Sequence, residues 1–372
     1  MSRVYRASDL AAIAALCVSF GLSTAHAHHP GIGGGSGAGA IVTIGAATLD
    51  QGQFAVATIL EYIRVRELDD ATLAANAGKD VHSLRAIESR SVSFAYGVTN
   101  DLTISARLPW VRRTNIREGE QELPDDPADP LPPPTVNNRG NTSGIGDLTV
   151  LTQMRFLNNP VTGTQIAALL GFKAPTGVTN RFDNFGELFD AEFQPGSGSW
   201  DGLFGAAFSQ RWGNWSFHSN VLYMLVSKGT QDTDLGDRFL YNAAAVYRLF
   251  GETEQIEHLH MHAGETHAGR TAASRAPQSA PAVPAEPHRR VALDGILEIN
   301  GTWSDHKRVA GVVDPNSGGN TVYLSPGLRL TIDNWAGFAT FGIPIVNDPN
   351  GVQSKTDWRV LTGIAVAFGG QQ

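Results

Sequence analysis

Alternation of apolar and polar positions is the dominant pattern of this chain after residue 27. The range 215–226 reads WSFHSNVLYMLV, with aromatic or aliphatic residues at most odd positions and serine, histidine or asparagine at three even positions. One face of such a strand suits lipid and the other suits water. A single segment would also fit a soluble β-sandwich. Segments of this kind recur, however, with about the length that crosses a bilayer at a tilt, and this recurrence predicts a transmembrane β-barrel.

The same reading along the chain predicts about twelve strands, an even number that leaves both chain ends in the periplasm. The predicted strands are Phe54–Arg66, Ser91–Val98, Leu102–Leu108, Ile145–Phe156, Thr164–Lys173, Trp200–Trp212, Trp215–Val226, Asp237–Leu249, Val291–Trp303, Thr321–Ile332, Trp335–Ile345 and Thr356–Phe368. We therefore predict an all-β fold, a transmembrane antiparallel β-barrel of outer-membrane type. The pattern is compatible with a monomer or a trimer.

Short and long connections alternate between the predicted strands. Those at Thr99, Asn158 and Gly213 are short, as is the one at Asp333, and we place them in the periplasm. Pro109 is expected to end its strand because proline cannot donate to a sheet.

Two of the remaining connections are long, and we place them outside the cell, where they would restrict entry. They are 112–144, which is rich in Pro, Asp and Asn and should be solvent-exposed, and 174–199. The seven tryptophans fall at or near predicted strand ends, as expected for side chains at a membrane interface.

The N-terminus indicates export. Arg3 and Arg6 precede an apolar run over 10–22, and Ala-His-Ala at 25–27 is a small-x-small cleavage site, so residues 1–27 are predicted to be a cleaved signal peptide. The only cysteine, Cys17, lies in that run, and we expect neither a lipid anchor nor a disulfide. These features predict the outer membrane of a Gram-negative cell, with outer-membrane lipid and the barrel-assembly machinery as partners.

Four further regions complete the expected organisation. Residues 28–53 form a Gly- and His-rich segment, for which we favour a flexible lead-in over a plug threaded through the barrel. The barrel spans 54–368 and contains a low-complexity periplasmic insertion at 251–290, and 369–372 form a tail. The formal net charge of −8 argues against a nucleic-acid partner.

Strand parity predicts which charged side chains face the lumen. The candidates are Glu61, Arg107, Asp147, Arg155, Lys173, Arg211, Arg238, Arg248, Asp294, Glu298, Arg329 and Arg359. Charges of both signs could line a selective conduit for solutes. They could equally pair across a narrow barrel and form its packed core. The sequence leaves both interpretations open.

The insertion suggests metal chemistry. His258, His260, His262 and His267 lie close together, and imidazoles at this spacing on a flexible chain can ligate Zn²⁺, Cu²⁺ or Ni²⁺. The alternative is a solvated low-complexity linker, since 272–287 continues the segment with an Ala- and Pro-rich composition. No other cofactor is expected.

A lipid-modifying barrel enzyme is a further hypothesis, because His218-Ser219-Asn220 is similar to the His-x-Ser-Asn motif of lipid A deacylases. Adjacent residues of a strand point to opposite faces, however, so His218 and Ser219 could not act together on one lipid. We interpret His218 as an interior histidine beside Asn220 and predict no catalytic residues.

Several turn and strand-end motifs carry a family resemblance. They are Tyr96–Leu102 (YGVTNDL), Leu108-Pro109, Gly144–Leu148 (GIGDL) and Gly171–Gly177 (GFKAPTG). Together they resemble the outer-membrane transporter family associated with the meta-pathway of phenol degradation. The resemblance implies a barrel and passage of small molecules, including aromatic or hydrophobic compounds, and implies no catalytic residues. The leading hypothesis is a passive channel, and the metal-linked barrel is the alternative.

Overall fold

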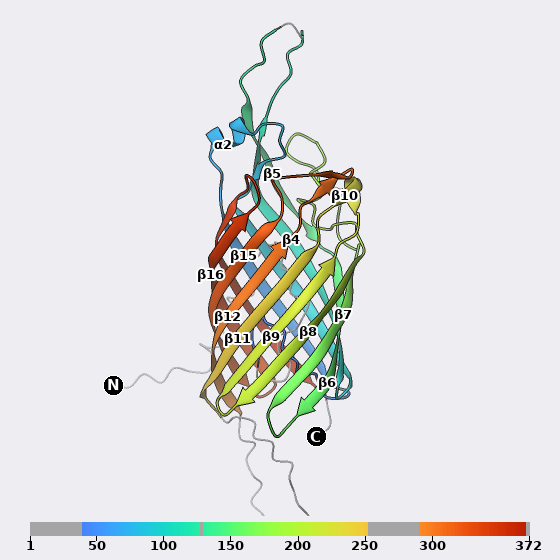
Figure 1. Ribbon diagram of the computed structural model, residues 1–372, viewed down its shortest axis with the longest axis vertical. Helices are drawn as coiled ribbons and strands as arrows, with labels where there is room; N and C mark the ends of the chain where they lie inside the picture. Colours follow the sequence, from blue (N-terminus) through green and yellow to red (C-terminus); the bar gives the residue numbers. More distant parts are fainter. Residues whose placement is uncertain (1–38, 127–128, 252–289, 370–372) are drawn as a thin grey trace, which may run out of the picture.

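Twelve antiparallel strands close into a single barrel in the structure, a computed structural model that describes residues 39–126, 129–251 and 290–369 (Figure 1). Around the barrel they are β1 (Phe54–Arg66), β3 (Ala86–Thr99), β4 (Leu102–Glu120), β6 (Leu148–Asn159), β7 (Thr164–Ala174), β8 (Asp201–Trp212), β9 (Trp215–Leu225), β11 (Arg238–Phe250), β12 (Val291–Ser304), β15 (Gly319–Ile332), β16 (Trp335–Pro349) and β17 (Lys355–Phe368). β17 pairs with β1 and closes the wall. The predicted fold class is confirmed, and each predicted strand overlaps one barrel strand.

Side chains alternate between the lumen and the outer surface along the wall. In β9, Phe217 and Val221 are exposed outward, whereas His218, Asn220 and Leu222 are buried inside. The outward positions of other strands are also apolar, among them Phe94, Ile104, Leu170, Phe204, Leu297, Leu328, Phe341 and Ile364. This apolar outer surface is what a lipid-facing barrel wall requires. No helix among the described residues is long and apolar enough to cross a membrane.

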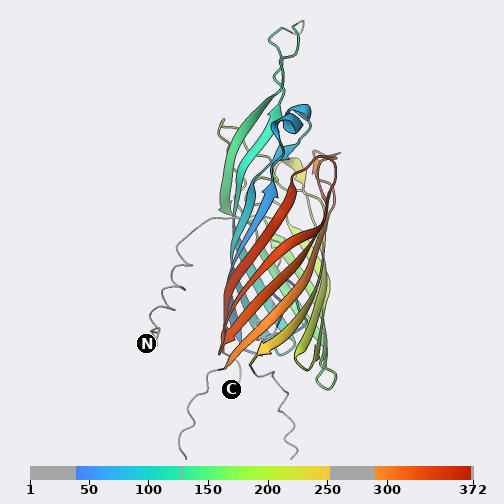
Figure 2. The ribbon, with the colours of Figure 1, turned by 90° about the vertical axis from the view of Figure 1, so that its left-hand side faces the viewer.

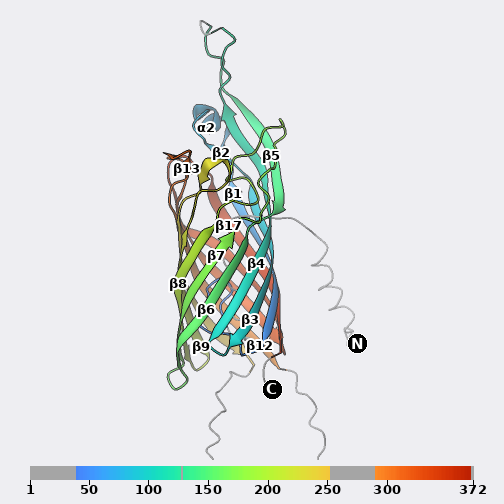
Figure 3. The ribbon, with the colours of Figure 1, turned by 90° about the vertical axis from the view of Figure 1, so that its right-hand side faces the viewer.

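The short connections all lie at one end of the barrel, at the turns following Thr99, Asn159, Trp212 and Ile332. Gly213 and Asp333 both have positive φ there, as tight hairpin turns require. The smaller elements gather at the opposite end (Figures 1 and 3). They are α2 (Asp70–Ala75), β2 (His82–Ser83), β5 (Thr135–Ile145), η1 (Thr230–Asp232), β10 (Thr233–Asp234), β13 (Arg308–Val309) and β14 (Val312–Val313).

The long outer connection expected at 112–144 contains more strand than predicted. β4 continues to Glu120, and β5 pairs with this outer part, so the two strands project beyond the barrel as an arm (Figure 2). The predicted strand end at Pro109 is therefore wrong. β4 pairs with β6 as far as Arg107 and with β5 from Trp110, so Pro109 lies where the neighbour changes and its missing N–H falls in the gap.

Candidate functional site

The lumen is lined by the charged residues that strand parity selected. Nine of the predicted candidates are buried, namely Glu61, Arg107, Asp147, Lys173, Arg238, Asp294, Glu298, Arg329 and Arg359. Arg155 lies at the short-turn end and pairs with Asp101, with 11% of its side chain exposed. Arg211 shares the inward parity but is exposed at the rim of the short-turn end. Burial of these nine agrees with their inward parity, and a role in lining a solute path stays a prediction.

Opposite charges pair between neighbouring strands on the inner face of the wall. Lys173 lies 3.5 Å from the Asp147 carboxylate and also contacts Asp201. Arg248 binds Asp294 at 2.5 Å. Buried charges need such partners because the interior solvates them poorly. These contacts satisfy the buried charges along the wall, and pairing across the barrel stays a prediction.

A stretch of the N-terminal segment, residues 40–49, crosses the lumen. Glu298 is fully buried, and its carboxylate accepts backbone N–H bonds from Ile41, Val42 and Thr43 at 3.0–3.1 Å. Arg329 donates to the Ala40 carbonyl oxygen at 2.9 Å. We call residues 40–49 the lumen segment. This finding differs from the flexible lead-in favoured for 28–53 and matches the plug alternative over its described part.

Further along, the lumen segment is bound by neutral polar groups from several strands. Asn220 accepts the N–H of Ile44, Ser209 accepts that of Ala46, and Gln153 donates to the carbonyl oxygens of residues 45 and 47. The wall thus supplies partners for these backbone polar groups, as burial demands. A Gly-rich composition indicates flexibility of an isolated chain, but it could not reveal these acceptors on distant strands.

Apolar contacts and one close approach fix the position of the lumen segment. Ile44 and Ala46 pack against a cluster that includes Leu203, Leu222 and Leu240. A Cβ on Gly45 would lie 2.9 Å from Nδ1 of His218, so this position favours glycine. The segment therefore fits this lumen by shape as well as by hydrogen bonding.

His218 lies inside the barrel and is satisfied there. Its Nδ1 is 2.8 Å from Ser209 Oγ, and its Nε2 is 3.2 Å from Ser216 Oγ. His218 and Asn220 are buried, whereas Ser219, between them, has the opposite parity. The arrangement needed for a lipid-facing His–Ser pair is therefore not formed at this motif.

The connection between β7 and β8, residues 175–200, folds over the barrel mouth at the end opposite the short turns. We call it the mouth loop. Arg113 donates to the carbonyl oxygens of Phe193 and Gln194 at 3.0 Å. Ser197 donates its N–H and its hydroxyl to Asp147 at 2.8 and 2.6 Å. The mouth loop thus narrows the end where the sequence placed entry.

A cavity of about 300 Å³ lies at this mouth. Its lining combines apolar side chains with ionisable ones, and it includes Val81, Ile116, Leu188, Phe189, Phe193, Asp80, His82, Glu118, Arg139, Asp183, Glu187 and Asp190. These residues come from the β1–β3 connection, β4, β5 and the mouth loop. No sequence motif indicated them, because they lie on segments that are far apart in the chain and follow no recognisable spacing.

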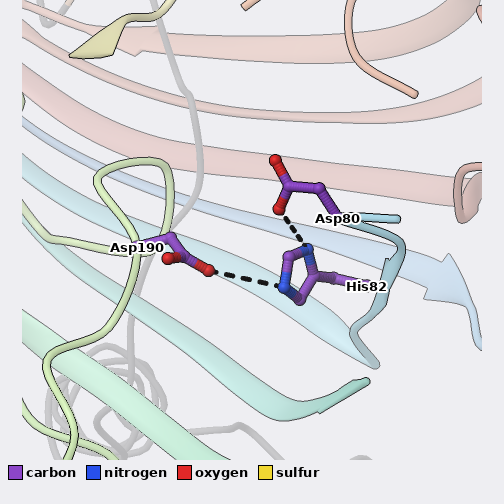
Figure 4. A group of neighbouring side chains, drawn as sticks. All are labelled: Asp80, His82 and Asp190. Atoms are coloured by element: carbon purple, nitrogen blue, oxygen red, sulfur yellow. Dashed lines mark ion pairs between the residues drawn. The ribbon is translucent and has the colours of Figure 1, made fainter. Parts of the chain in front are cut away.

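His82 is at the centre of this charged group, with 8% of its side chain exposed (Figure 4). Its Nε2 lies 2.7 Å from Glu118 and 3.4 Å from Asp190, and its Nδ1 lies 3.6 Å from Asp80 and 3.7 Å from Glu192. Burial lowers the pKa of His82, but the hydrogen bond to Glu118 and the charges of Glu192, Glu118 and Asp190 outweigh it and raise the pKa.

Two cations extend the group to neighbouring loops. Lys307 lies 2.8 Å from Asp80 and also contacts Glu192, and these carboxylates raise its pKa although burial acts in the opposite direction. Arg139 binds Glu118 and Asp183. Burial acts to raise the pKa of Glu118. The hydrogen bonds and charges of His82 and Arg139 lower this pKa by more, so the net shift is downward.

The geometry around His82 suits an imidazolium better than a shared metal ion. Asp80, His82 and Asp190 offer ligand atoms within 4.8 Å of one another. Asp80 faces Nδ1 whereas Asp190 faces Nε2, on opposite edges of the ring (Figure 4). Because the two nitrogen lone pairs diverge, an ion on either nitrogen would be approached by only one of the aspartates. The predicted metal ligands His258, His260, His262 and His267 lie outside the described residues, and that site stays a prediction.

These features define an outer-membrane-type β-barrel with a polar lumen, an inserted N-terminal segment and an infolded mouth loop. Residues 35–266, more than half of the chain, match the family described as "Putative MetA-pathway of phenol degradation". The chain belongs to this family, which confirms the resemblance found in its turn motifs.

Comparison with solved structures gives one match that supports the fold and several weaker ones. An outer membrane channel from Pseudomonas putida F1 matches with a TM-score of 0.52 and 16% identity, over 87% of this chain and 98% of that one. The toluene transporter TbuX from Ralstonia pickettii matches at 0.32 and 9% identity, over 86% and 90% of the two chains. LpxR from Salmonella typhimurium matches at 0.37 and 9%, over 84% and 99%. Only the first score supports a common fold. A comparison with curated proteins found no match.

Proposed function

We propose that this protein is a passive outer-membrane channel for small molecules, without a catalytic role, and that aromatic compounds are among its solutes. Membership of a family named for phenol degradation carries the solute class. The observation that carries the channel itself is a closed barrel with a polar, charged lumen crossed by a separate piece of chain. A barrel built only for rigidity would have no need of a separable segment inside it.

Passage through this lumen requires the lumen segment to move. Residues 40–49 contact the wall from Thr103 of β4 across to Arg329 of β15, so they span the interior. Their bonds to the wall are made by side chains, which can exchange them for water when the segment leaves. The conduit and packed-core interpretations then describe two states of one lumen, with the segment displaced or inserted.

The mouth loop adds a second restriction at the other end. Asp147 and Lys173 on the wall hold Ser197 of the loop, with 2.7 Å between Lys173 Nζ and the Ser197 hydroxyl. These contacts keep the base of the loop on the barrel. A solute entering from this end would pass the loop first and the lumen segment second.

The experiment that tests the channel compares the full mature chain with a variant lacking residues 28–49, both reconstituted in liposomes. We expect influx of phenol-sized neutral aromatic solutes to be faster through the variant than through the full chain. A sugar of similar mass serves as the control for solute class. Circular dichroism establishes that both barrels are folded. The channel would be refuted if liposomes containing the folded variant took up neither solute faster than protein-free liposomes do.

A further inference from the structure

One imidazole, that of His82, contacts four carboxylates where the β1–β3 connection, β4 and the mouth loop meet. Asp80 belongs to the β1–β3 connection, Glu118 to β4, and Asp190 and Glu192 to the mouth loop. The edge of His82 also packs on Phe193, with ring centroids 4.9 Å apart. One side chain of the β1–β3 connection is therefore in contact with three neighbouring residues of the mouth loop.

The position of the carboxylates matches the two N–H groups of a protonated ring. An imidazolium donates from both nitrogens, whereas a neutral imidazole donates from only one. Here each nitrogen faces two carboxylate groups. A neutral ring could still donate from Nε2 to Glu118, but Asp80 and Glu192, at 3.6 and 3.7 Å from Nδ1, would lose the positive charge that attracts them. The four carboxylates would then repel one another at short range.

The surrounding charges do not replace the proton on His82. Lys307 reaches Asp80, Glu192 and, at 3.4 Å, Asp314. Arg139 reaches Glu118, Glu120, Asp183 and Glu187. Arg113 is close enough to Glu192 to interact electrostatically. Carboxylates outnumber these cations, so the group stays acidic even when His82 is charged.

We propose that His82 is a proton-operated latch that, when protonated, holds residues 190–192 of the mouth loop over the mouth and, when neutral, releases them. The latch rests on the geometry described above, and its effect on solute passage rests on the proposed function. Arg113 donates to the carbonyl oxygens of Phe193 and Gln194, and Gln231 donates to that of Phe189. These bonds do not involve His82, so release is limited to residues 190–192. Because the latched state favours the protonated ring, latching is complete below the ordinary pKa of about 6.5 and is lost as the pH rises through the raised pKa of His82.

A thiol-labelling experiment tests the latch without using channel activity. In a chain carrying Cys17→Ser, a cysteine replaces Ala191, which is 4% exposed between Asp190 and Glu192. A second protein carries the cysteine at Val161, which is 93% exposed in the short β6–β7 turn and supplies the reference rate at each pH. We expect the ratio of the two rates to rise between pH 6 and 9, about tenfold for each unit by which latching raises the pKa.

Substitutions of His82 separate a proton effect from a packing effect. In His82→Gln the ratio should be high and independent of pH, whereas in His82→Lys, which keeps a cation, it should stay low at every pH. His306→Gln is the matched control, because His306 is at the same mouth, 3.7 Å from Asp305, and the wild-type pH dependence should persist.

Several results would overturn the latch. They are a pH-independent ratio in the unsubstituted protein, equal behaviour of His82→Lys and His82→Gln, and loss of the pH dependence when a chelator is added, which would assign the site to a metal ion. If labelling follows the expected pattern while the variant lacking 28–49 admits no solute at any pH, the latch holds and the channel proposal fails.

Discussion

Replacement of Glu298 by alanine should release the lumen segment. Three backbone N–H groups, from Ile41, Val42 and Thr43, lose their only carboxylate acceptor in this variant. Hydrogen bonds to a charged group contribute about 1.5–3 kcal/mol each. The three N–H groups share two oxygens. Removal of a fully buried carboxylate also removes its desolvation cost, so we take a net loss of about 3 kcal/mol. This loss corresponds to a roughly 100-fold higher population of the displaced segment.

The assay is single-channel recording in a planar bilayer. The frequency of openings should rise by about two orders of magnitude, whereas the conductance of each opening should change little, since the wall is otherwise intact. Glu61→Gln is the matched control, because Glu61 is also a buried lumen carboxylate but lies 3.7 Å from Arg359 of the wall and not against the segment. A folded Glu298→Ala protein that opens as rarely as the unsubstituted protein would refute this account, as would an equal effect of Glu61→Gln.

Three further predictions address other parts of the molecule. Gly45→Ala places a methyl group 2.9 Å from His218 Nδ1, which should destabilise the inserted segment by about 1–3 kcal/mol and increase the frequency of channel openings. Adding His218→Ala should reverse this increase, and no reversal would mean that the contact with His218 is not the cause. Asp147→Asn weakens the bonds to Ser197 and Lys173. The free energy of unfolding in lipid, measured with urea, should therefore fall by about 1–3 kcal/mol, and an unchanged value would contradict the anchoring role of Asp147. Zinc binding, measured by calorimetry, should be lost when residues 251–290 are deleted, and binding that persists would exclude those histidines as the ligands.

The barrel wall was predictable because its strands are under a local constraint. Each membrane-spanning strand must present an apolar face to lipid over about ten residues. Because alternate residues of a strand share a face, this requirement is visible as alternation along the sequence. β1 was predicted with its observed limits, Phe54–Arg66. Inward placement of Glu298 and Arg329 followed from the same parity. β5 was missed because the arm it forms with β4 stands outside the barrel and carries no lipid-facing pattern.

The position of the lumen segment and the charges at the mouth depended on contacts across the fold. Glu298 is more than 250 residues from the N–H groups it accepts. His82 meets Glu118 and Asp190 only because separate connections converge at one end of the barrel. No spacing in the chain records such contacts.

The sequence by itself therefore determined the barrel, its strand order, its inward charged positions and its family, since lipid imposes a periodic pattern on consecutive residues. Only the tertiary structure decided that residues 40–49 lie in the lumen, that the mouth loop folds inward and that His82 is surrounded by carboxylates. These features depend on long-range pairing energies, and such energies are set by where the closed barrel brings distant side chains together.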